Sequence, residues 1–302
     1  MKEHLIIESN FDKIPLDTII MSPAHPKGII QFSHGMCEHK ERYFEFMNYL
    51  CEHDYVCIIN DHRGHGKSIH QEDDLGFFYE NGHEGIVEDL HQLTLLIKAR
   101  YPELPLYLFG HSMGSLVVRC YLKKYDQDID GLFVCGSPSR NPAAKMGISL
   151  ARLVTKLKHD HHRSKLIQKI GFGAFNKKFG NKENSWIGSD EDIVNAYNKN
   201  PLCHFTFTTN GFESLFQLMQ QTYSLQGWQV KHKDLPIHFI AGHEDPCIEN
   251  ETKFNEAVHF LEERGYTDVS SYLFDNMRHE ILNEKEKDKV YQHVLNILKS
   301  WE

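Results

Sequence analysis

The stretch from Leu106 to Val118 constrains the fold more than any other part of the chain. Its apolar residues follow a strand pattern up to Gly110 and a helical period after the next turn, so Ser112 stands at the corner between a strand and a helix. Such a corner is strained, and glycines at 110 and 114 omit the side chains that would clash where the helix crosses the strand. The serine hydroxyl is held out of the turn, in a position that suits a nucleophile. The Met113 N–H points at the oxyanion that would form when this hydroxyl attacks a carbonyl.

The rest of the chain alternates between strand and helix patterns. Short apolar runs predict strands at 4–8, 16–21, 28–33, 55–60, 106–110, 131–136, 235–241 and 268–274. Helical periods lie at 42–52, 84–100, 250–264 and 284–300. Strands that are apolar throughout are buried on both faces. The sequence therefore predicts an α/β fold with a mostly parallel eight-stranded sheet and helices on both of its faces.

The alternation stops between residues 139 and 232, where only helical patterns occur. We expect this segment to be a helical lid inserted after the sixth strand, over the carboxyl edge of the sheet where ligands bind in open α/β folds. Residues 1–138 and 233–302 then form the core. From Ser139 to Lys182 the lid carries eleven Lys and Arg and a single acidic residue, in a chain of net charge −9. No nucleic-acid recognition motif accompanies this basic segment, so we expect no nucleic-acid partner.

Residues 142–158 of the lid predict an amphipathic helix. Its apolar stripe is Met146, Leu150, Leu153 and Leu157, and its basic residues are Lys145, Arg152 and Lys156. The favoured interpretation is a cap helix whose apolar stripe covers the pocket. The alternative adds transient contact with an anionic membrane surface, to which each basic residue contributes about 1 kcal/mol.

A serine hydroxyl becomes a good nucleophile only with a neighbouring base and a group that orients this base. In this fold the acid and the histidine follow the serine along the chain, each in a loop after a strand. His279 follows the last predicted strand and is the expected base. Glu244 and Asp245 follow the strand before it. Asp245, which shares a turn with Pro246, is the expected orienting acid, and Glu244 is the alternative.

The loop after the strand at 28–33 faces the serine corner across the sheet edge. Gly35 lets the backbone turn close, and the Met36 N–H is expected to join that of Met113 in an oxyanion hole. An apolar channel for an acyl chain is expected in the aromatic second half of the lid. The residues expected to contact substrate are His34, Gly35 and His111 near the serine, and Phe205, Phe212 and Phe216 in the lid.

Two clusters of histidine and acidic residues, at 61–65 and 159–162, are candidates for a metal site. A complete Ser-His-Asp set can carry out the reaction without a catalytic metal, so we expect neither metal nor cofactor. The seven cysteines form no C-x-x-C pair and are expected to be reduced. No apolar run is long enough for a signal peptide or a membrane span. The expected location is cytoplasmic, with peripheral membrane contact left open.

Motifs along most of the chain carry a family resemblance. They are His34-Gly35-Met36-x-Glu38-His39-x-x-Arg42-Tyr43, Asp61-His62-Arg63-Gly64-His65-Gly66-x-Ser68, Gly110-His111-Ser112-Met113-Gly114, Ala196-Tyr197-x-x-Asn200-Pro201-Leu202-Cys203, Gly242-x-x-Asp245 and His279-Glu280-Ile281-Leu282-Asn283-Glu284. In this order they resemble the monoacylglycerol lipase and lysophospholipase group of α/β-hydrolases. The resemblance implies a serine hydrolase acting on carboxylic esters of glycerol or glycerophospholipids, with Ser112, Asp245 and His279 in the catalytic positions. The basic first half of the lid departs from the group and leaves the head group of the lipid open.

Other functions are compatible with the same fold. A peptidase or amidase for small substrates would need an acidic group placed to bind a free amine, and a short-chain carboxylesterase would use the same serine machinery. A receptor that keeps the fold without turnover predicts a broken triad, whereas the triad in this sequence is complete. Acyl-chain length and oligomeric state are not determined by any of these patterns.

Overall fold

A computed structural model describes residues 1–302, and its centre is a single eight-stranded sheet. The strands are β1 (Lys2–Glu8), β2 (Pro15–Met21), β3 (Gly28–Ser33), β4 (Tyr55–Asn60), β5 (Leu106–His111), β6 (Gly131–Cys135), β7 (Ile237–Gly242) and β8 (Val269–Phe274). Their order across the sheet is β1-β2-β4-β3-β5-β6-β7-β8. Strand β2 runs antiparallel to both of its neighbours, and every other pair is parallel. The predicted mostly parallel sheet of eight strands is confirmed.

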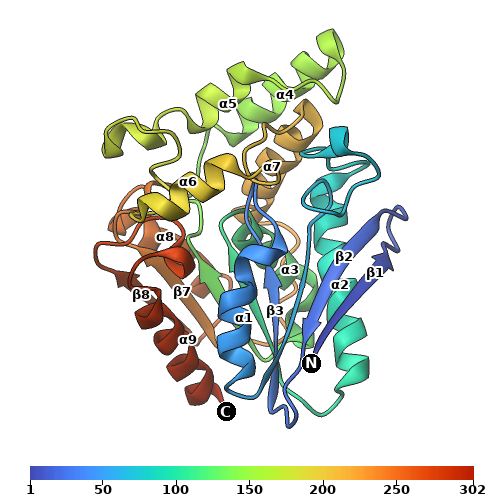
Figure 1. Cartoon of the computed structure of the whole chain (residues 1–302), viewed down its shortest axis with the longest axis vertical. Helices are drawn as coiled ribbons and strands as arrows, with labels where there is room; N and C mark the ends of the chain where they lie inside the picture. Colours follow the sequence, from blue (N-terminus) through green and yellow to red (C-terminus); the bar gives the residue numbers. More distant parts are fainter.

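Helices cover both faces of the sheet (Figure 1). The longer helices of the core are α1 (Phe44–Cys51), α2 (Gly82–Arg100), α3 (Met113–Tyr125), α8 (Glu251–Glu262) and α9 (Lys287–Trp301). Helices α1 and α9 pack on one face, through side chains such as Phe46 and Leu295. Helices α2, α3 and α8 pack on the other face, through Leu90, Val117 and Phe254 among others. None of the helices combines the length and the apolar character needed to cross a bilayer.

Short 3-10 helices lie in the connecting loops. They are η1 (Lys40–Tyr43), η2 (Glu72–Asp74), η3 (Asp126–Asp128), η4 (Phe175–Phe179), η5 (Pro246–Ile248) and η6 (Ile281–Asn283). Two of them matter for the site, because η1 follows the loop after β3 and η5 follows the loop after β7. All seven cysteines are free, and all but Cys51 are buried.

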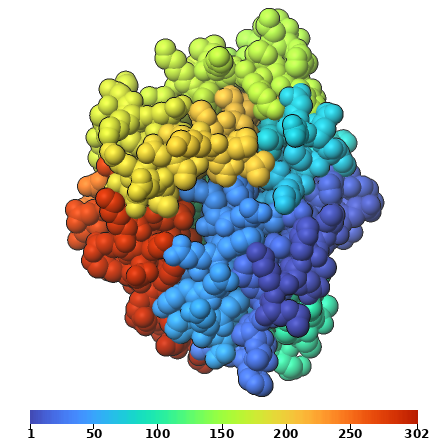
Figure 2. Space-filling view, viewed as in Figure 1, coloured from blue at the N-terminus to red at the C-terminus, as the bar shows by residue number.

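The chain between β6 and β7 forms a helical layer above the carboxyl end of the sheet, which we call the lid (residues 139–232; Figure 1). It contains α4 (Ala144–Lys158), α5 (Lys165–Phe172), α6 (Glu191–Lys199) and α7 (Thr209–Thr222). In the space-filling view these residues close over the upper end of the molecule (Figure 2). The loops at the carboxyl ends of the strands therefore lie beneath the lid.

Helix α4 does not cover the pocket with its apolar stripe, so the favoured interpretation of this helix is wrong. Met146, Leu153 and Leu157 are between 54% and 72% exposed, and only Leu150 of the stripe is half-buried. The buried face of α4 carries Ala144, Ile148 and Ala151 instead. This face packs against α7, where Gly147 leaves room for the ring of Phe216. The buried face of α4 thus fills the lid interior, and the larger apolar side chains of the predicted stripe face solvent.

Two buried cations on α3 hold the two ends of the lid. Arg119 donates to Ser137 Oγ (2.6 Å) where the chain enters the lid, and its guanidinium lies over the ring of Tyr223. Lys123, one turn later, donates to the carbonyl oxygens of Ser224 and Gln226 where the chain leaves the lid. Neither cation has a carboxylate partner. Helix α3 thus joins the serine corner at its first turn to both lid connections.

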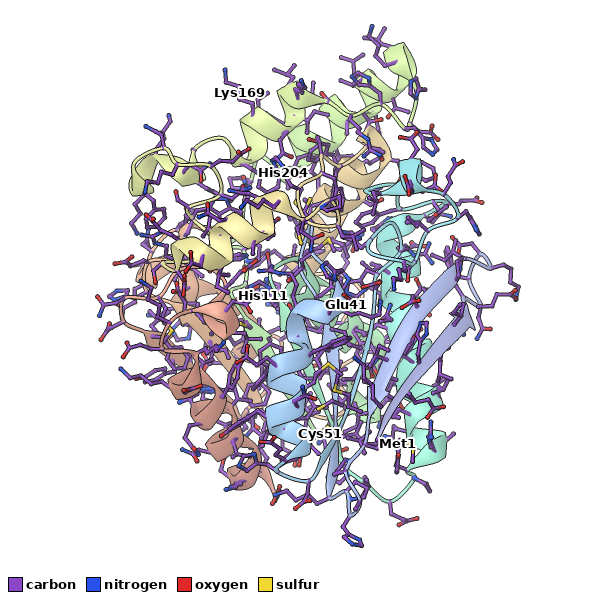
Figure 3. All side chains as sticks on the ribbon, in the orientation of Figure 1. Met1, Glu41, Cys51, His111, Lys169 and His204 are labelled. Atoms are coloured by element: carbon purple, nitrogen blue, oxygen red, sulfur yellow. The ribbon has the colours of Figure 1, made fainter.

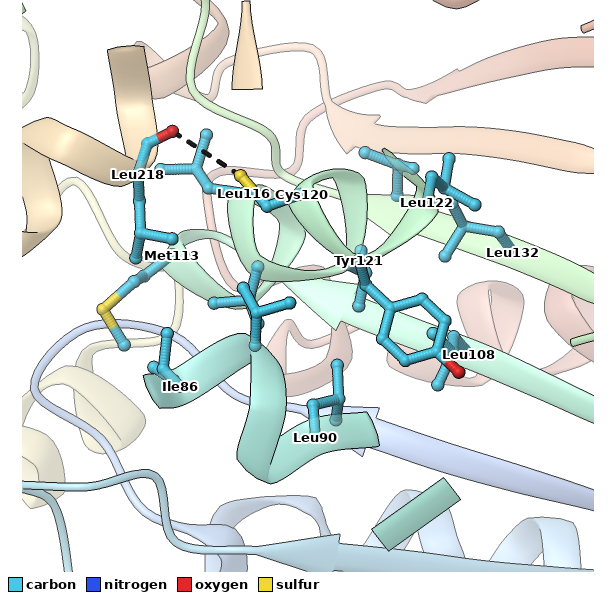
Figure 4. Close-up of a cluster of buried hydrophobic side chains, with 14 of the residues drawn as sticks. Ile86, Leu90, Leu108, Met113, Leu116, Cys120, Tyr121, Leu122, Leu132 and Leu218 are labelled. Atoms are coloured by element: carbon cyan, nitrogen blue, oxygen red, sulfur yellow. Dashed lines mark hydrogen bonds between the residues drawn. The ribbon is translucent and has the colours of Figure 1, made fainter. Parts of the chain in front are cut away.

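Helix α3 is buried along most of its length (Figure 4). The Tyr121 hydroxyl donates to Thr94 Oγ1 of α2 (3.3 Å), and the Cys120 thiol lies against the Leu218 carbonyl oxygen of α7. At its first turn the helix touches the neighbouring strand, because a Cβ at Gly114 would lie 1.9 Å from the carbonyl oxygen of Ser33. Only a glycine permits this approach, which sets the position of Ser112 above the sheet.

Candidate active site

Ser112 lies between β5 and α3 with a left-handed backbone conformation (φ +54°, ψ −120°). A residue with a side chain pays a conformational cost there, and such strain is usually kept where the position of that side chain matters. The Ser112 N–H is tied to the Cys135 carbonyl oxygen of β6 (2.9 Å). The Ser115 hydroxyl donates to the Ser112 carbonyl oxygen. Both main-chain groups of the serine are therefore anchored, and its hydroxyl is free to face the loops.

The structure brings together three side chains that are far apart in the sequence. The Ser112 hydroxyl donates to His279 Nε2 (2.8 Å), and His279 Nδ1 donates to Asp245 Oδ2 (2.9 Å). The second oxygen of Asp245 accepts the Cys247 N–H (2.8 Å), which fixes the orientation of the carboxylate. All three side chains are buried. This arrangement can remove a proton from the serine hydroxyl and hold the resulting imidazolium beside a carboxylate.

Glu244, the alternative acid, lies elsewhere. Its side chain is 43% exposed, and its carboxylate is 3.8 Å from Arg278 Nε. It forms no hydrogen bond or ion pair with His279. Of the two candidates, Asp245 is the one that the fold places next to the histidine.

Two residues beside Ser112 have backbone N–H groups that are not used in the fold. Those of Met36 and Met113 have no hydrogen-bond acceptor within the protein, and both residues line the cavity. The loop that carries Met36 is held by Glu38, whose carboxylate accepts the Gly35 N–H and the Tyr43 hydroxyl. Free N–H groups in a preformed loop can stabilise the negative charge that develops on a carbonyl oxygen under attack.

A buried charge network supports this loop. Arg42 makes a two-pronged ion pair with Glu280 (2.5 and 2.6 Å) and also contacts Glu38 (3.3 Å). His111, the residue before the serine, bridges Glu38 Oε1 (3.1 Å) and the His279 carbonyl oxygen (3.2 Å). Burial alone would raise the pKa of Glu38, but His111 and Arg42 hold it well below its usual value. Glu38 is therefore a carboxylate that links the loop of Met36 to the loop of His279.

A cavity of about 570 Å³ extends from Ser112 into the lid. Figure 3 shows His111 in the middle of the molecule, His204 above it and Lys169 at the outer rim of the lid. Of the residues expected to contact substrate, four line this cavity, namely Gly35, His111, Phe205 and Phe216. No residue of α4 lines it.

His34 and Phe212 do not line the cavity, contrary to expectation. The His34 ring is turned away from it and packs against His62 and His65, with ring centroids 4.3 and 5.2 Å apart. Phe212 is fully buried in the lid, where it packs against Phe207. The cavity has further apolar residues beyond the six expected substrate contacts. Leu116 comes from α3, and the others come from the lid, including the second half in which an acyl channel was expected. They are Leu116, Phe172, Phe175, Trp186, Ile187, Tyr197, Leu215 and Met219.

The three histidines His34, His62 and His65 make the fold sensitive to acid. Burial lowers the pKa of His34 to about 4 and that of His65 to about 3, and it holds the pKa of His62 well below its usual value. A histidine whose pKa is lower in the folded state than in the unfolded state contributes stability above the unfolded pKa of about 6.5, and this contribution is lost progressively as the pH falls from that value to the folded pKa.

We expect the free energy of unfolding to fall between pH 6.5 and 4, by about 1.4 kcal/mol per pH unit for each histidine that stays neutral in the fold. Urea titrations at fixed pH values would measure this slope. His65→Phe removes one of these groups and should flatten the slope, since the ring already packs among Phe78, Phe205 and Phe207. A stability that stays constant over this pH range would contradict the assignment.

Comparisons with known proteins agree with this architecture. Residues 24–286 match the family described as serine aminopeptidase, S33. The chain is 25% identical over 287 residues to a monoglyceride lipase homolog of Monkeypox virus, which covers 92% of this chain and 90% of the viral protein. It is 25% identical over 273 residues to a monoacylglycerol lipase of Mycolicibacterium smegmatis, with 89% and 87% coverage.

Among solved structures, a thermostable carboxyl esterase from Bacillus coagulans, determined in complex with glycerol, superimposes with a TM-score of 0.89. The two chains are 26% identical, and the match covers 99% of this chain and 98% of the esterase. The family match spans most of the sequence, including the serine corner and the loops of the acid and the histidine. The chain therefore belongs to the serine aminopeptidase S33 family of α/β-hydrolases.

Proposed function

We propose that this protein is a serine hydrolase that cleaves carboxylic esters of glycerol-based lipids, such as monoacylglycerols or lysophospholipids. The observation that carries the proposal is the hydrogen-bonded series from Ser112 through His279 to Asp245, which opens into a cavity with an apolar wall. The similarity to monoacylglycerol lipases over about nine-tenths of the chain supports the same substrate class.

In the proposed mechanism, Ser112 Oγ attacks the ester carbonyl carbon while His279 Nε2 takes the hydroxyl proton. Asp245 keeps the imidazole in the required tautomer and stabilises its charged form. The N–H groups of Met36 and Met113 bind the oxyanion. His279 then gives its proton to the departing alcohol, and water, activated in the same way, releases the acid from the acyl-enzyme.

The apolar residues of the cavity suit an acyl chain. Leu215, Phe216 and Met219 come from one face of α7, and Leu116 from α3 faces the same space. A pocket that is largely apolar with a few polar groups is typical of small-molecule sites. An amine-binding site would need a free carboxylate at the cavity. Glu38 and Glu280 are paired with Arg42, whereas the exposed Glu249 is an acidic group that such a site would use.

A hydrolysis panel tests the substrate class. It compares p-nitrophenyl esters of graded chain length, monoacylglycerols, lysophospholipids and aminoacyl anilides, each with the wild-type protein and Ser112→Ala. We expect turnover of the glycerol lipid esters and no Ser112-dependent turnover of the anilides. Preference for the anilides would replace the lipid proposal with the peptidase one. Activity confined to the shortest esters would favour a short-chain carboxylesterase.

We also propose that the lid touches an anionic lipid surface. Met146, Leu153 and Leu157 of α4 and Leu166 and Ile170 of α5 are exposed on the outside of the lid. Basic side chains accompany them, and Lys145, Lys156 and Lys158 form no ion pair within the protein. An apolar patch with basic neighbours gains both from insertion into the interface and from attraction to acidic lipids.

The triple variant Lys145→Glu/Lys156→Glu/Lys158→Glu should bind vesicles rich in phosphatidylglycerol at least about tenfold more weakly, because three attractive charges become repulsive. Arg152 is left in place because it pairs with Glu213 (2.7 Å). Vesicle sedimentation measures the binding, and turnover of a soluble short ester reports on the site. As a control for the apolar patch, Leu157→Ser is compared with Leu95→Ser, an exposed leucine of α2. Equal binding by the triple variant and the wild type would remove this part of the proposal.

A further inference from the structure

The proposed mechanism makes no use of a thiol that lies beside the histidine. Cys247 belongs to η5, in the loop after β7, and its Sγ is 4.0 Å from His279 Nε2. Its backbone N–H donates to Asp245 Oδ1 (2.8 Å) and so holds the carboxylate in place. Cys247 lines the same cavity as Ser112 and His279. A solute that reaches the serine therefore also reaches this sulfur.

The spacing of these atoms fits a metal ion. In a tetrahedral zinc site, with bonds of about 2.3 Å to sulfur and 2.0–2.1 Å to nitrogen, the two ligand atoms lie about 3.6 Å apart. The distance between Cys247 Sγ and His279 Nε2 is 4.0 Å, which exceeds this separation by a few tenths of an ångström. Ligand atoms of Asp245, Cys247 and His279 all lie within 4.8 Å of one another, and no other group of three or more potential ligands in the protein is so close.

The surroundings favour a cation at this position. Asp245 accepts a hydrogen bond from His279 Nδ1–H, so Nε2 carries a lone pair, which faces Ser112 Oγ. A carboxylate that supports a histidine from behind is the common outer arrangement of zinc-bound histidines. Ser112 Oγ, 2.8 Å from Nε2, and water in the cavity are available as further oxygen ligands. The negative charge of Asp245 would partly offset that of a divalent ion.

The same surroundings argue against other chemistry for the thiol. Burial, and then the neighbouring Asp245, raise the pKa of Cys247 well above its usual value, so the group is held as a thiol. A neutral thiol is a weak nucleophile and resists oxidation. A divalent cation, by contrast, can take the place of the thiol proton, because its positive charge stabilises the thiolate that remains.

We propose that Cys247 and His279 form a reversible inhibitory site for a thiophilic divalent cation, with Zn²⁺ and Cd²⁺ as its chemical class. One ion binds Sγ and Nε2, the thiol proton passes to solvent, and no electrons are exchanged. With Nε2 occupied, the Ser112 hydroxyl has no acceptor for its proton, so attack on an ester stops. The hard cations Mg²⁺ and Ca²⁺ prefer oxygen ligands and should not bind here. The inhibition rests on the function proposed above, whereas binding of the ion does not.

Binding is measured on the full chain carrying Ser112→Ala, so that it is independent of turnover. Cd²⁺ is added to metal-free protein, and the ultraviolet charge-transfer band of a cadmium thiolate is recorded alongside calorimetry. We expect one equivalent to produce the band and release one proton. Adding Cys247→Ser should abolish the band. Adding Cys203→Ser, a buried thiol that lines the same cavity, should leave the band in place. A band that survives Cys247→Ser would overturn the site.

The functional consequence is tested with Zn²⁺ on otherwise native protein hydrolysing p-nitrophenyl butyrate. Each variant is normalised to its own metal-free rate, and a chelator should restore that rate. We expect Cys247→Ser to require at least about tenfold more Zn²⁺ for half-inhibition, because a site that loses a thiolate ligand loses most of its affinity. Equal sensitivity of the two proteins would overturn the inference. Absence of ester hydrolysis in metal-free wild-type protein would instead overturn the proposed function, and the cadmium band would still report on the metal site.

Discussion

The Asp245→Asn variant is expected to hydrolyse a soluble ester with a kcat about 10⁴-fold below that of the wild type. The Asp245 carboxylate accepts a hydrogen bond from His279 Nδ1–H, which keeps the proton on Nδ1 and leaves Nε2 free to take the proton of the serine. An amide at this position can turn its N–H₂ group towards Nδ1, which selects the tautomer that carries its proton on Nε2. That imidazole can no longer act as a base. Steady-state kinetics with p-nitrophenyl butyrate measure the loss.

Glu244→Gln is the matched control, because it makes the same change of acid to amide in the adjacent residue. Glu244 is partly exposed and contacts Arg278 rather than His279. Its kcat should stay within about twofold of the wild-type value, as expected for a surface substitution away from the site. If Glu244→Gln caused the large loss and Asp245→Asn did not, the assignment of the acid would be reversed.

The Gly114→Ala variant is expected to lose more than about 4 kcal/mol of stability, or to fail to fold. The added methyl group would lie 1.9 Å from the Ser33 carbonyl oxygen and 2.6 Å from that of His34. Both atoms are backbone and cannot rotate away, so α3 would have to move off the sheet. Chemical denaturation followed by circular dichroism measures the change.

Gly171→Ala is the comparison for this substitution. Gly171 lies in α5 with nothing within 4 Å of the position of an added Cβ. The exchange should be neutral or stabilise by about 0.5–1 kcal/mol, because alanine loses less backbone entropy in a helix than glycine. Similar losses for the two variants would mean that the contact between α3 and β3 is not what requires Gly114.

Local patterns predicted those parts of the fold that depend on neighbours in the sequence. The corner at Ser112 could be located because a buried strand, two glycines and a helix follow one another within a few residues. The loops of Asp245 and His279 could be located because each follows a recognisable strand. Parallel strands bring their carboxyl ends to one edge, so residues more than a hundred positions apart meet without any further information.

The side of a helix that faces inward was harder to predict. Helix α4 has two apolar faces. One carries Ile148 and Ala151 and is the smaller, and the other carries the long side chains of Met146 and Leu153. Periodicity favours the larger face for burial, but packing against α7 needs the smaller one. The choice depends on the partner helix, which a single pattern does not contain.

Long-range pairs were not predictable for the same reason. The ion pair of Arg42 with Glu280 joins two motifs of the sequence, and neither motif predicts that the other is its partner. The positions of Arg119 and Lys123 at the two ends of the lid follow only from the folded chain. The cytoplasmic location, the absence of a nucleic-acid partner and the division into core and lid stay predictions.

The central claim is that Ser112 is the nucleophile of a folded serine hydrolase, and labelling with a fluorophosphonate tests it most directly. We predict that the native protein gains the mass of one adduct, that peptide mapping places it on Ser112, and that Ser112→Ala and the unfolded protein gain none. His279→Ala should react far more slowly, because the serine then lacks its base. An adduct on another residue, or equal labelling of wild type and Ser112→Ala, would contradict the account.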